Sequence, residues 1–276
     1  MTEPLTAAPA GGADADQQAE LLHVAHALAD AARAAILPWF RSADLSADNK
    51  LETGFDPVTA ADRAGERAMR EVLATLRPDD GIEGEEEGTT ASRSGFTWVL
   101  DPIDGTRAFL AGTATWGVLI AVNRGGAPLL GLVDQPYMDE RFVGCPGRPE
   151  LHRGGFVRPL ATRAPRDLDQ AILLTTFPEV GTAEEGAAFA RVRDRVRLTR
   201  YGLDCYGYAL LALGGVDLVI EAGLQSYDIQ GPQAVVEAAG GIVTDWQGGP
   251  AHRGGRVIAA ANAKVHAAAL ALLNGG

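Results

Sequence analysis

Nine residues decide how the rest of this chain is organised: Trp98-Val99-Leu100-Asp101-Pro102-Ile103-Asp104-Gly105-Thr106. Apolar residues run up to one aspartate, and a second aspartate follows three positions later. The pattern predicts a buried strand, residues 96–100, whose carboxyl end delivers both carboxylates into a cleft. The proline stiffens the turn, the glycine lets backbone amides approach a ligand closely, and Thr106 can cap the next helix. The stretch therefore predicts a site for a divalent cation and a phosphate group.

Composition and charge limit the classes of protein to which the chain can belong. The chain has 276 residues, 46% of them hydrophobic, which suffices for one large domain or two joined halves. A formal net charge of −12 argues against non-specific nucleic-acid binding, which needs a basic surface, and suits a cationic ligand or plain solubility equally well. No apolar run is long enough for a membrane span, and no secretory signal is seen. With two cysteines in the whole chain, a reducing cytoplasm is expected.

The rhythm of the sequence changes near residue 150. Residues 1–15 are rich in Ala, Gly, Pro and Thr and predict a disordered leader. Residues 16–150 predict two helices followed by a largely antiparallel sheet, an N-terminal α+β half that carries the metal-site motifs. Residues 151–276 alternate strands with helices, which indicates a C-terminal α/β half. We therefore predict an α/β (α+β) fold in which both halves form one compact catalytic unit.

Shorter predictions concern the first half. Apolar residues at helical spacing predict one amphipathic helix over residues 17–40. The polar residues 41–55 predict a mobile loop, and residues 109–115 predict a second loop. His23 and His26 lie three apart on the first helix, a spacing that suits a metal ion. With no third ligand nearby, however, surface or packing roles are favoured.

A run of acids between glycines, Gly84-Glu85-Glu86-Glu87-Gly88, precedes the central strand. Clustered acids in a loop are usually solvated. A strand that ends at Ile82 would instead deliver Glu85 beside Asp101. Mg²⁺ prefers carboxylates, carbonyls and water as ligands. The candidate donors are Glu85, Asp101, the carbonyl of Ile103, and Asp104. The run leaves open whether Glu85 or Glu86 is the ligand.

Two more acids, Asp62 and Asp228, each stand near the start of a predicted helix. Thr59-x-x-Asp62 is close to a capping box, and capping alone would explain the aspartate. Asp228 precedes an Ala- and Val-rich helix, where an N-cap role is the plainer interpretation. A functional role for either residue needs support from beyond its own neighbourhood.

The order of four motifs resembles the inositol monophosphatase-like family of metal-dependent phosphatases. The motifs are DPVTAAD (56–62), GEEEG (84–88), DPIDGT (101–106), and Asp228 ahead of GPQAVVEAAGG (231–241). The resemblance covers nearly all of the chain after the leader. It implies a layered αβαβα fold of the sugar-phosphatase type and Mg²⁺-dependent hydrolysis of small phosphate monoesters.

The resemblance also implies roles for the residues that match the motifs. The implied ligands of two or three Mg²⁺ ions are Glu85, Asp101, Ile103 through its carbonyl, Asp104 and Asp228. Asp62 and Thr106 would orient the attacking water and help to deprotonate it, with Glu85 also part of the catalytic set. The amides of Gly105 and Thr106 would cradle the phosphate. The implied partners are a small phosphate monoester and a second copy of the chain in a homodimer.

Longer stretches, residues 201–228 and 254–273 among them, resemble the histidinol-phosphatase branch of the family. Histidinol carries an ammonium and an imidazole, so acids beside the leaving group would suit it. Asp204 and Glu221 are the candidate substrate-binding residues, although Glu221 would also suit an inositol and Asp204 a helix cap. The preferred hypothesis is hydrolysis of L-histidinol phosphate to L-histidinol and phosphate, in histidine biosynthesis, by direct attack of a metal-activated water.

Two other functions remain open. An inositol-1-phosphate phosphatase, or a broad phosphatase of small monoesters, would use the same motifs. The alternative of another class is a non-catalytic homologue that binds metal or phosphate for regulation. Retention of the whole expected acid set counts against that alternative. No histidine lies in an acidic cluster and no nucleophile motif is found, so phosphohistidine and triad mechanisms have little support.

Overall fold

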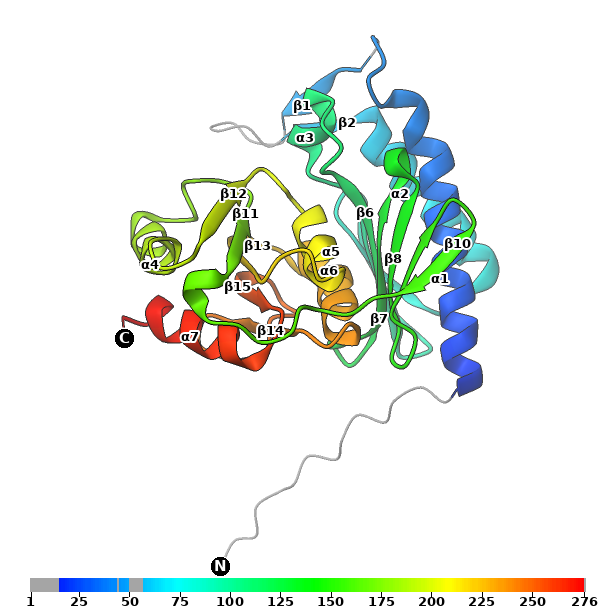
Figure 1. Cartoon of the computed structure of the whole chain (residues 1–276). Coiled ribbons are helices and arrows are strands. Elements are labelled where there is room, and N and C mark those ends of the chain that lie inside the picture. Colours follow the sequence, from blue (N-terminus) through cyan, green and yellow to red (C-terminus); the bar gives the residue numbers. More distant parts are fainter. Residues whose placement is uncertain (1–14, 44, 50–56, 276) are drawn as a thin grey trace, which may run out of the picture.

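The computed structural model describes residues 15–43, 45–49 and 57–275 (Figure 1). The predicted leader lies outside the described residues apart from Ala15, and so does the predicted loop from Lys50 to Phe55. Among the helices of the described part, none combines the length and apolar character needed to cross a membrane. Two large β-sheets, one two-stranded sheet and the helices around them make up the described chain.

The larger sheet has eight strands in the order β10-β9-β8-β7-β6-β5-β3-β4. In chain order these are β3 (Gly81–Gly84), β4 (Gly88–Thr90), β5 (Phe96–Asp104), β6 (Gly117–Arg124), β7 (Pro128–Gln135), β8 (Glu140–Gly144), β9 (Glu150–Arg153) and β10 (Phe156–Pro159). Neighbours pair antiparallel except β3 and β5, which run parallel. The predicted antiparallel character of this half is therefore confirmed.

The smaller sheet has five strands in the order β12-β11-β13-β15-β14. They are β11 (Ile172–Thr175), β12 (Leu198–Tyr201), β13 (Leu218–Leu224), β14 (Ile242–Asp245) and β15 (Gly255–Ala260). The first three run parallel and β15 pairs antiparallel with both of its neighbours. A separate antiparallel pair is formed by β1 (Ala47–Asn49) and β2 (Pro57–Thr59).

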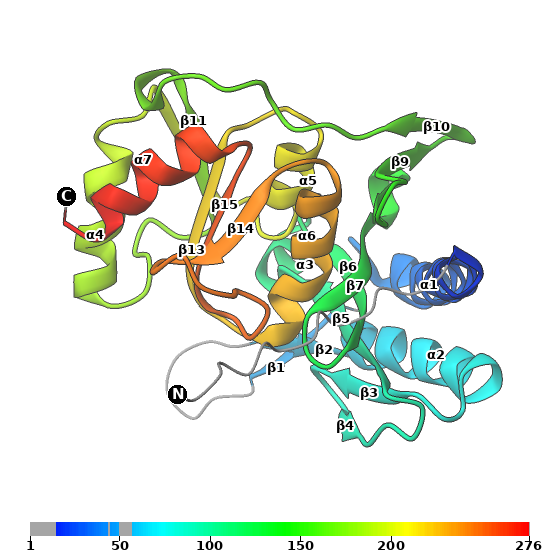
Figure 2. The same cartoon turned by 90° about the horizontal axis from the view of Figure 1, so that it is seen from below.

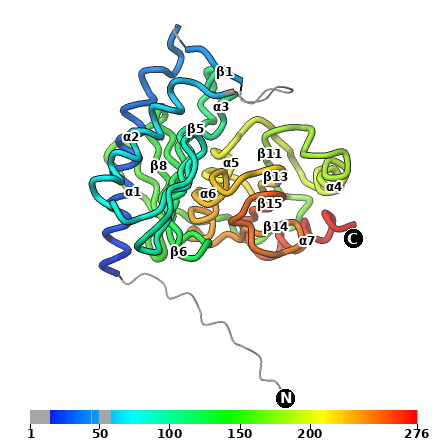
Figure 3. Tube along the Cα trace, turned by 180° about the vertical axis from the view of Figure 1, so that it is seen from behind, coloured from blue at the N-terminus to red at the C-terminus, as the bar shows by residue number. Residues whose placement is uncertain are grey.

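Helices and sheets alternate in five layers (Figure 2). The outer helices α1 (Ala15–Ile36) and α2 (Ala60–Leu76) lie side by side on one face of the larger sheet (Figure 3). The helices α5 (Tyr206–Ala212) and α6 (Ser226–Ala238) lie between the sheets, and α4 (Ala183–Arg193) and α7 (Ala263–Leu273) cover the far side of the smaller sheet. The predicted αβαβα layering is confirmed.

Burial on both faces explains the long apolar runs of the central strands. Along β6, Val118, Ile120 and Val122 belong to the core under α1 and α2, whereas Leu119 belongs to the core between the sheets. Successive strand residues point to opposite faces, so a strand covered on both sides needs apolar side chains at nearly every position.

Several element boundaries differ from prediction. The first helix ends at Ile36 and gives way to a 3₁₀ turn at Leu37–Trp39, because Pro38 cannot supply the backbone N–H of a continuing helix. Residues 109–111, predicted as loop, belong to the short helix α3 (Thr106–Ala111). Two further 3₁₀ turns span Pro136–Met138 and Leu168–Gln170.

The larger sheet also continues past residue 150, where the sequence suggested a change of half. A hairpin of β9 and β10 extends it to Pro159. The hairpin turns on Gly154 and Gly155, which both have positive φ angles. Two adjacent glycines at such angles are a typical two-residue hairpin turn. These two short strands were not predicted from the sequence.

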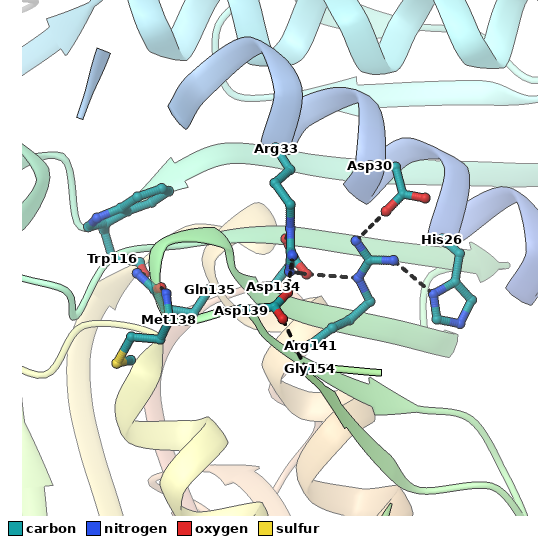
Figure 4. Close-up of polar contacts among 10 residues, drawn as sticks. All are labelled: His26, Asp30, Arg33, Trp116, Asp134, Gln135, Met138, Asp139, Arg141 and Gly154. Carbon is teal, nitrogen blue, oxygen red and sulfur yellow. Dashed lines mark hydrogen bonds and ion pairs between the residues drawn. The ribbon is translucent and has the colours of Figure 1, made fainter. Parts of the chain in front are cut away.

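A buried ion-pair network ties α1 to the larger sheet (Figure 4). The fully buried Asp134, on β7, accepts hydrogen bonds from Nε and Nη2 of Arg33 at 3.2 and 2.9 Å. Arg141, on β8, reaches the same carboxylate through Nε at 2.7 Å. Its remaining nitrogens contact Asp30 at 2.7 Å and Nδ1 of His26 at 3.0 Å. His26 therefore has a packing role, as the sequence favoured.

Replacing Asp134 with alanine should lower the free energy of unfolding by about 3 kcal/mol or more, because two arginines would lose their shared buried partner. Thermal or denaturant unfolding measures the loss. The matched control is Asp139→Asn, because Asp139 also pairs with Arg33, at 2.5 Å, but is largely exposed. That variant should change stability by less than about 1 kcal/mol. Equal losses in both variants would contradict the importance of the buried member.

Candidate active site

A β-bulge brings the two aspartates of the central stretch to one side of the sheet. In a regular strand, residues three apart point to opposite faces. Here Asp101 pairs with Leu119 and Asp104 with Gly117, so three steps along β5 match two along β6. The extra residue turns both carboxylates the same way. The strand thus runs to Asp104 and does not end at Leu100 as predicted.

Carboxylate oxygens of Asp101, Asp104 and Asp228 lie within 4.8 Å of one another. Burial, followed by the charge of Glu85, raises the pKa of Asp101 well above its usual range. Burial, followed by the charge of Asp228, does the same to the pKa of Asp104. Negative charges so close together in a buried place repel one another. The cluster therefore fits a divalent cation, which would neutralise that repulsion.

Asp62 serves the cap of α2 with one oxygen and faces Thr106 with the other. Its Oδ2 accepts hydrogen bonds from the amide and hydroxyl of Thr59 at 2.8 and 2.5 Å, which is the predicted capping box. Its Oδ1 lies 3.4 Å from Oγ1 of Thr106. Burial raises the pKa of Asp62, although the bonds from Thr59 oppose that shift. Asp62 is thus a buried carboxylate that reaches the site through Thr106.

Thr106 does not cap the helix that follows it, which corrects the prediction. The N-cap of α3 is Gly105, and Thr106 is the first residue of the helix. The Thr106 hydroxyl instead donates to the carbonyl of Ile103 at 3.1 Å. This contact ties Thr106 to the bulge that carries the aspartates.

Asp228 likewise combines a cap with a place in the cluster. It is the third residue of α6 and accepts a hydrogen bond from the amide of Gln225 at 2.6 Å. The N-cap is therefore Gln225, and the plainer interpretation of Asp228 as the N-cap was wrong by three positions. Asp62 stands at the same place in α2, so each helix delivers an acid from its first turn.

Glu66 holds the loop that presents Glu85. Glu66 is fully buried on α2, and its carboxylate accepts the amides of Glu86 and Glu87 at 2.7 and 3.0 Å. Arg70 donates to the same carboxylate at 2.9 Å. The loop held in this way points Glu85 at Asp101, and Glu85 lines the same cavity as Asp101. The geometry therefore favours Glu85 over Glu86 as the acid of the site.

Asp204 packs directly against the glycine of the central stretch. Gly105 has a φ of 82°, and a Cβ placed there would lie 2.9 Å from the side chain of Asp204. Asp204 accepts a hydrogen bond from Thr115 at 3.1 Å. Burial raises its pKa to about 6, with Thr115 and Arg107 opposing the shift. The cap of α5 is Cys205, so the alternative that Asp204 is the cap is wrong.

Glu221 is buried in the middle of β13 and is held by the end of β11 and the residue that follows it. It accepts hydrogen bonds from the Thr175 hydroxyl at 3.2 Å and from the amide and hydroxyl of Thr176 at 2.7 and 2.9 Å. Burial raises the pKa of Glu221 to about 7 in spite of these three bonds. An acid with this pKa ionises readily when a cation binds beside it.

One cavity of about 310 Å³ collects these residues from both sheets. Of the predicted site residues it is lined by Glu85, Asp101, Ile103, Asp104, Gly105, Thr106, Asp204, Glu221 and Asp228, with Asp62 behind Thr106. The lining residues that sequence reasoning missed include Arg107, Thr176, Phe177 and Tyr208. The backbone amide of Cys205 donates a hydrogen bond to Asp104 at 2.6 Å and thereby connects the C-terminal half of the chain to the N-terminal half.

Comparison with known proteins identifies the group to which this site belongs. The model of the inositol monophosphatase family matches residues 17–274. The chain belongs to the inositol monophosphatase family. It is accordingly a phosphoric monoester hydrolase, and phosphatases of this family use divalent metal ions.

Named relatives fall in more than one branch of the family. The chain is 44% identical over 227 residues to a chloroplastic bifunctional phosphatase, IMPL2, of Arabidopsis thaliana, of which the match spans 64%. It is 35% identical to a histidinol-phosphatase of Mycobacterium tuberculosis, with 92% of this chain and 98% of the relative covered. A solved structure of an inositol monophosphatase from Zymomonas mobilis superposes with a TM-score of 0.81 at 41% identity, covering 93% and 98% of the two chains.

Replacing Glu85 with glutamine should weaken binding of Mg²⁺ about tenfold or more, since a negative charge beside Asp101 is lost. Calorimetric titration of the cation and the Mg²⁺ dependence of phosphate release both measure the effect. The matched control is Glu86→Gln, one residue along the same loop, which should shift the affinity less than about twofold. A larger loss of Mg²⁺ affinity in the Glu86 variant than in the Glu85 variant would show that Glu86 is the cation ligand.

Replacing Glu66 with glutamine should also weaken Mg²⁺ binding about tenfold, because an amide group cannot accept both loop N–H bonds and the bond from Arg70. The KM for the phosphate ester at saturating Mg²⁺ should change little. Glu71→Gln, an exposed substitution on the same helix, is the control. A Glu66 variant with normal cation affinity would show that the loop holds its shape without this carboxylate.

Proposed function

We propose that this enzyme hydrolyses L-histidinol phosphate to L-histidinol and phosphate with Mg²⁺ as its cation, a step of histidine biosynthesis. The observation that carries the proposal is the pair of acids, the half-buried Asp204 and the buried Glu221, in the wall of the cavity that contains the cation cluster. The same cavity must therefore accommodate something besides a phosphate group. A positively charged alcohol is the leaving group that two such acids suit best.

The proposed cation ligands are Glu85, Asp101, the Ile103 carbonyl, Asp104 and Asp228. A cation bound there would offset the charge of the phosphate and lower the pKa of the attacking water. The amides of Gly105 and Thr106 would hold the phosphate against this cluster. All of these residues line the cavity.

Asp62 and Thr106 are the proposed base and its relay. The Thr106 hydroxyl lies between the cavity and Oδ1 of Asp62. A water held by Thr106 would pass its proton towards Asp62, whose raised pKa makes it a stronger base than an exposed aspartate. The water oxygen would then bond to phosphorus as the bond between phosphorus and the ester oxygen breaks. The departing oxygen would take up a proton to leave as the alcohol, and Asp62 would return the proton that it received to solvent, so that no net proton is gained or lost. No bond to the protein forms in this sequence.

The second candidate is an inositol-1-phosphate phosphatase, and the likeness to the Zymomonas mobilis inositol monophosphatase supports it. Polyols are bound through many hydroxyl contacts, and Glu221 would serve them as well as it serves an ammonium. Asp204 favours the first candidate, because a second acid in the cavity wall gains more from a cation than from a neutral hydroxyl.

A phosphate-release assay over three esters tests the proposal. With Mg²⁺, L-histidinol phosphate should show a kcat/KM at least about tenfold above that of inositol 1-phosphate or adenosine 3′,5′-bisphosphate, because the first ester alone carries a cationic alcohol. Glu221→Gln should narrow this preference by lowering kcat/KM mainly for histidinol phosphate. A preference for inositol 1-phosphate would reject the proposal, and no release from any ester would favour a binding role.

A further inference from the structure

The hydroxyl of Tyr208 is a buried polar group without a hydrogen-bond partner among the described residues. Tyr208 lies on α5, its ring belongs to the core between the sheets, and its side chain is 3% exposed. A buried hydroxyl left unpaired costs about 1–3 kcal/mol. Tyr208 also lines the cavity of the active site. A ligand that bonds to this hydroxyl would remove the cost.

The acids Glu221 and Asp104, which line the cavity with Tyr208, have hydrogen-bond donors of their own. Burial and then the charge of Glu221 raise the pKa of Tyr208 well above its ordinary value, with Asp104 and Asp228 adding to the shift. The phenol therefore stays protonated. Glu221 is bonded by Thr175 and Thr176, and Asp104 by Cys205. The phenol stands among carboxylates with its own oxygen still able to accept a hydrogen bond.

The place of the hydroxyl suggests which part of the substrate it meets. Asp104 and Asp228 belong to the cation cluster, where the phosphate is proposed to bind, and both line the same cavity as Tyr208. In L-histidinol phosphate the amino group sits on the carbon next to the one that bears the ester oxygen. The ammonium must then lie close to the phosphate, whereas the imidazole extends farther away.

Resting on the proposed function, we propose that Tyr208 determines specificity by binding the ammonium group of an amino-alcohol phosphate. The phenol oxygen accepts one of the three ammonium N–H bonds, and Glu221 supplies the opposite charge. Esters without the amino group leave the hydroxyl unpaired and gain nothing from it.

Two esters that differ by the amino group alone provide the test. L-Histidinol phosphate carries it, and 3-(imidazol-4-yl)propyl phosphate lacks it. Tyr208→Phe removes the oxygen and keeps the ring. It should lower kcat/KM for histidinol phosphate about tenfold or more, as expected for a hydrogen bond to a charged group, and leave that for the amine-free ester within about twofold. Calorimetry should show the same loss for binding of L-histidinol.

The matched control is Tyr206→Phe on the same helix. The Tyr206 hydroxyl donates to Glu140 at 2.6 Å, and Tyr206 is absent from the lining of the cavity. This variant can lower the unfolding temperature but should keep the ratio of the two kcat/KM values. Thermal unfolding of both variants separates a folding defect from a loss of recognition, since a folding defect lowers both rates together.

The outcomes distinguish this inference from the proposed function. A wild-type enzyme that prefers histidinol phosphate, combined with a Tyr208→Phe variant that affects both esters equally or neither, overturns the contact and leaves the substrate in place. A wild-type enzyme that fails on histidinol phosphate but acts on inositol 1-phosphate overturns the proposed substrate and this contact with it. A selective loss for the amine-bearing ester supports both.

Discussion

Repulsion between carboxylates that share one buried space is the constraint on which the arrangement of this enzyme depends. Four aspartates of the site, Asp62, Asp101, Asp104 and Asp228, are each held by a backbone amide, whereas Asp204 is held by the Thr115 hydroxyl. The donors are Thr59 for Asp62, Ile103 for Asp101, Cys205 for Asp104 and Gln225 for Asp228. A hydrogen bond from a backbone N–H stabilises the charged form of the carboxylate. It also fixes the position of the carboxylate, because the donating backbone belongs to a folded element. The two sheets and α6 hold these acids close to one another, although their mutual repulsion would otherwise drive them apart.

The central stretch allowed much of the site to be predicted, because its acids are adjacent in the sequence and at the end of an apolar run. The layered fold and the acids Glu85, Asp62 and Asp228 followed from the order of the motifs. What failed was local geometry. The bulge after Asp101 depends on the pairing of β5 with β6, and the short α3 depends on Gly105 taking a left-handed conformation against Asp204. Both depend on partners far away in the chain.

Residues that act through long-range contacts were also missed. Glu66 has the spacing of an ordinary helix residue, one turn after Asp62, and nothing in its neighbourhood shows that it will accept amides from another loop. Tyr208 reads as one more apolar residue in a helix of the core. Its importance arises from an unpaired atom, and an unpaired atom can be recognised only when all neighbours have been placed.

Asp62 and Asp228 show that a structural explanation and a functional one need not compete. A carboxylate has two oxygens with several acceptor positions, so one oxygen can close the first turn of a helix while the other faces the cavity. Removing such a residue would disturb the helix end and the site together. A loss of activity at either position therefore says less about chemistry than a change at Glu85, whose oxygens serve no helix cap among the contacts described above.

The hydrogen bond from Cys205 to Asp104 joins the helix layer between the sheets to the larger sheet, and its position has an evolutionary consequence. Most of the groups proposed for the reaction precede residue 107 and lie on the Asp104 side of this bond. Asp204, Tyr208 and Glu221, which are proposed to contact the alcohol, lie on the Cys205 side. Mutations in the second half can therefore change the preferred alcohol while the hydrolytic apparatus is inherited intact. A lineage with this division could acquire new substrates by small steps, each of which preserves a working phosphatase.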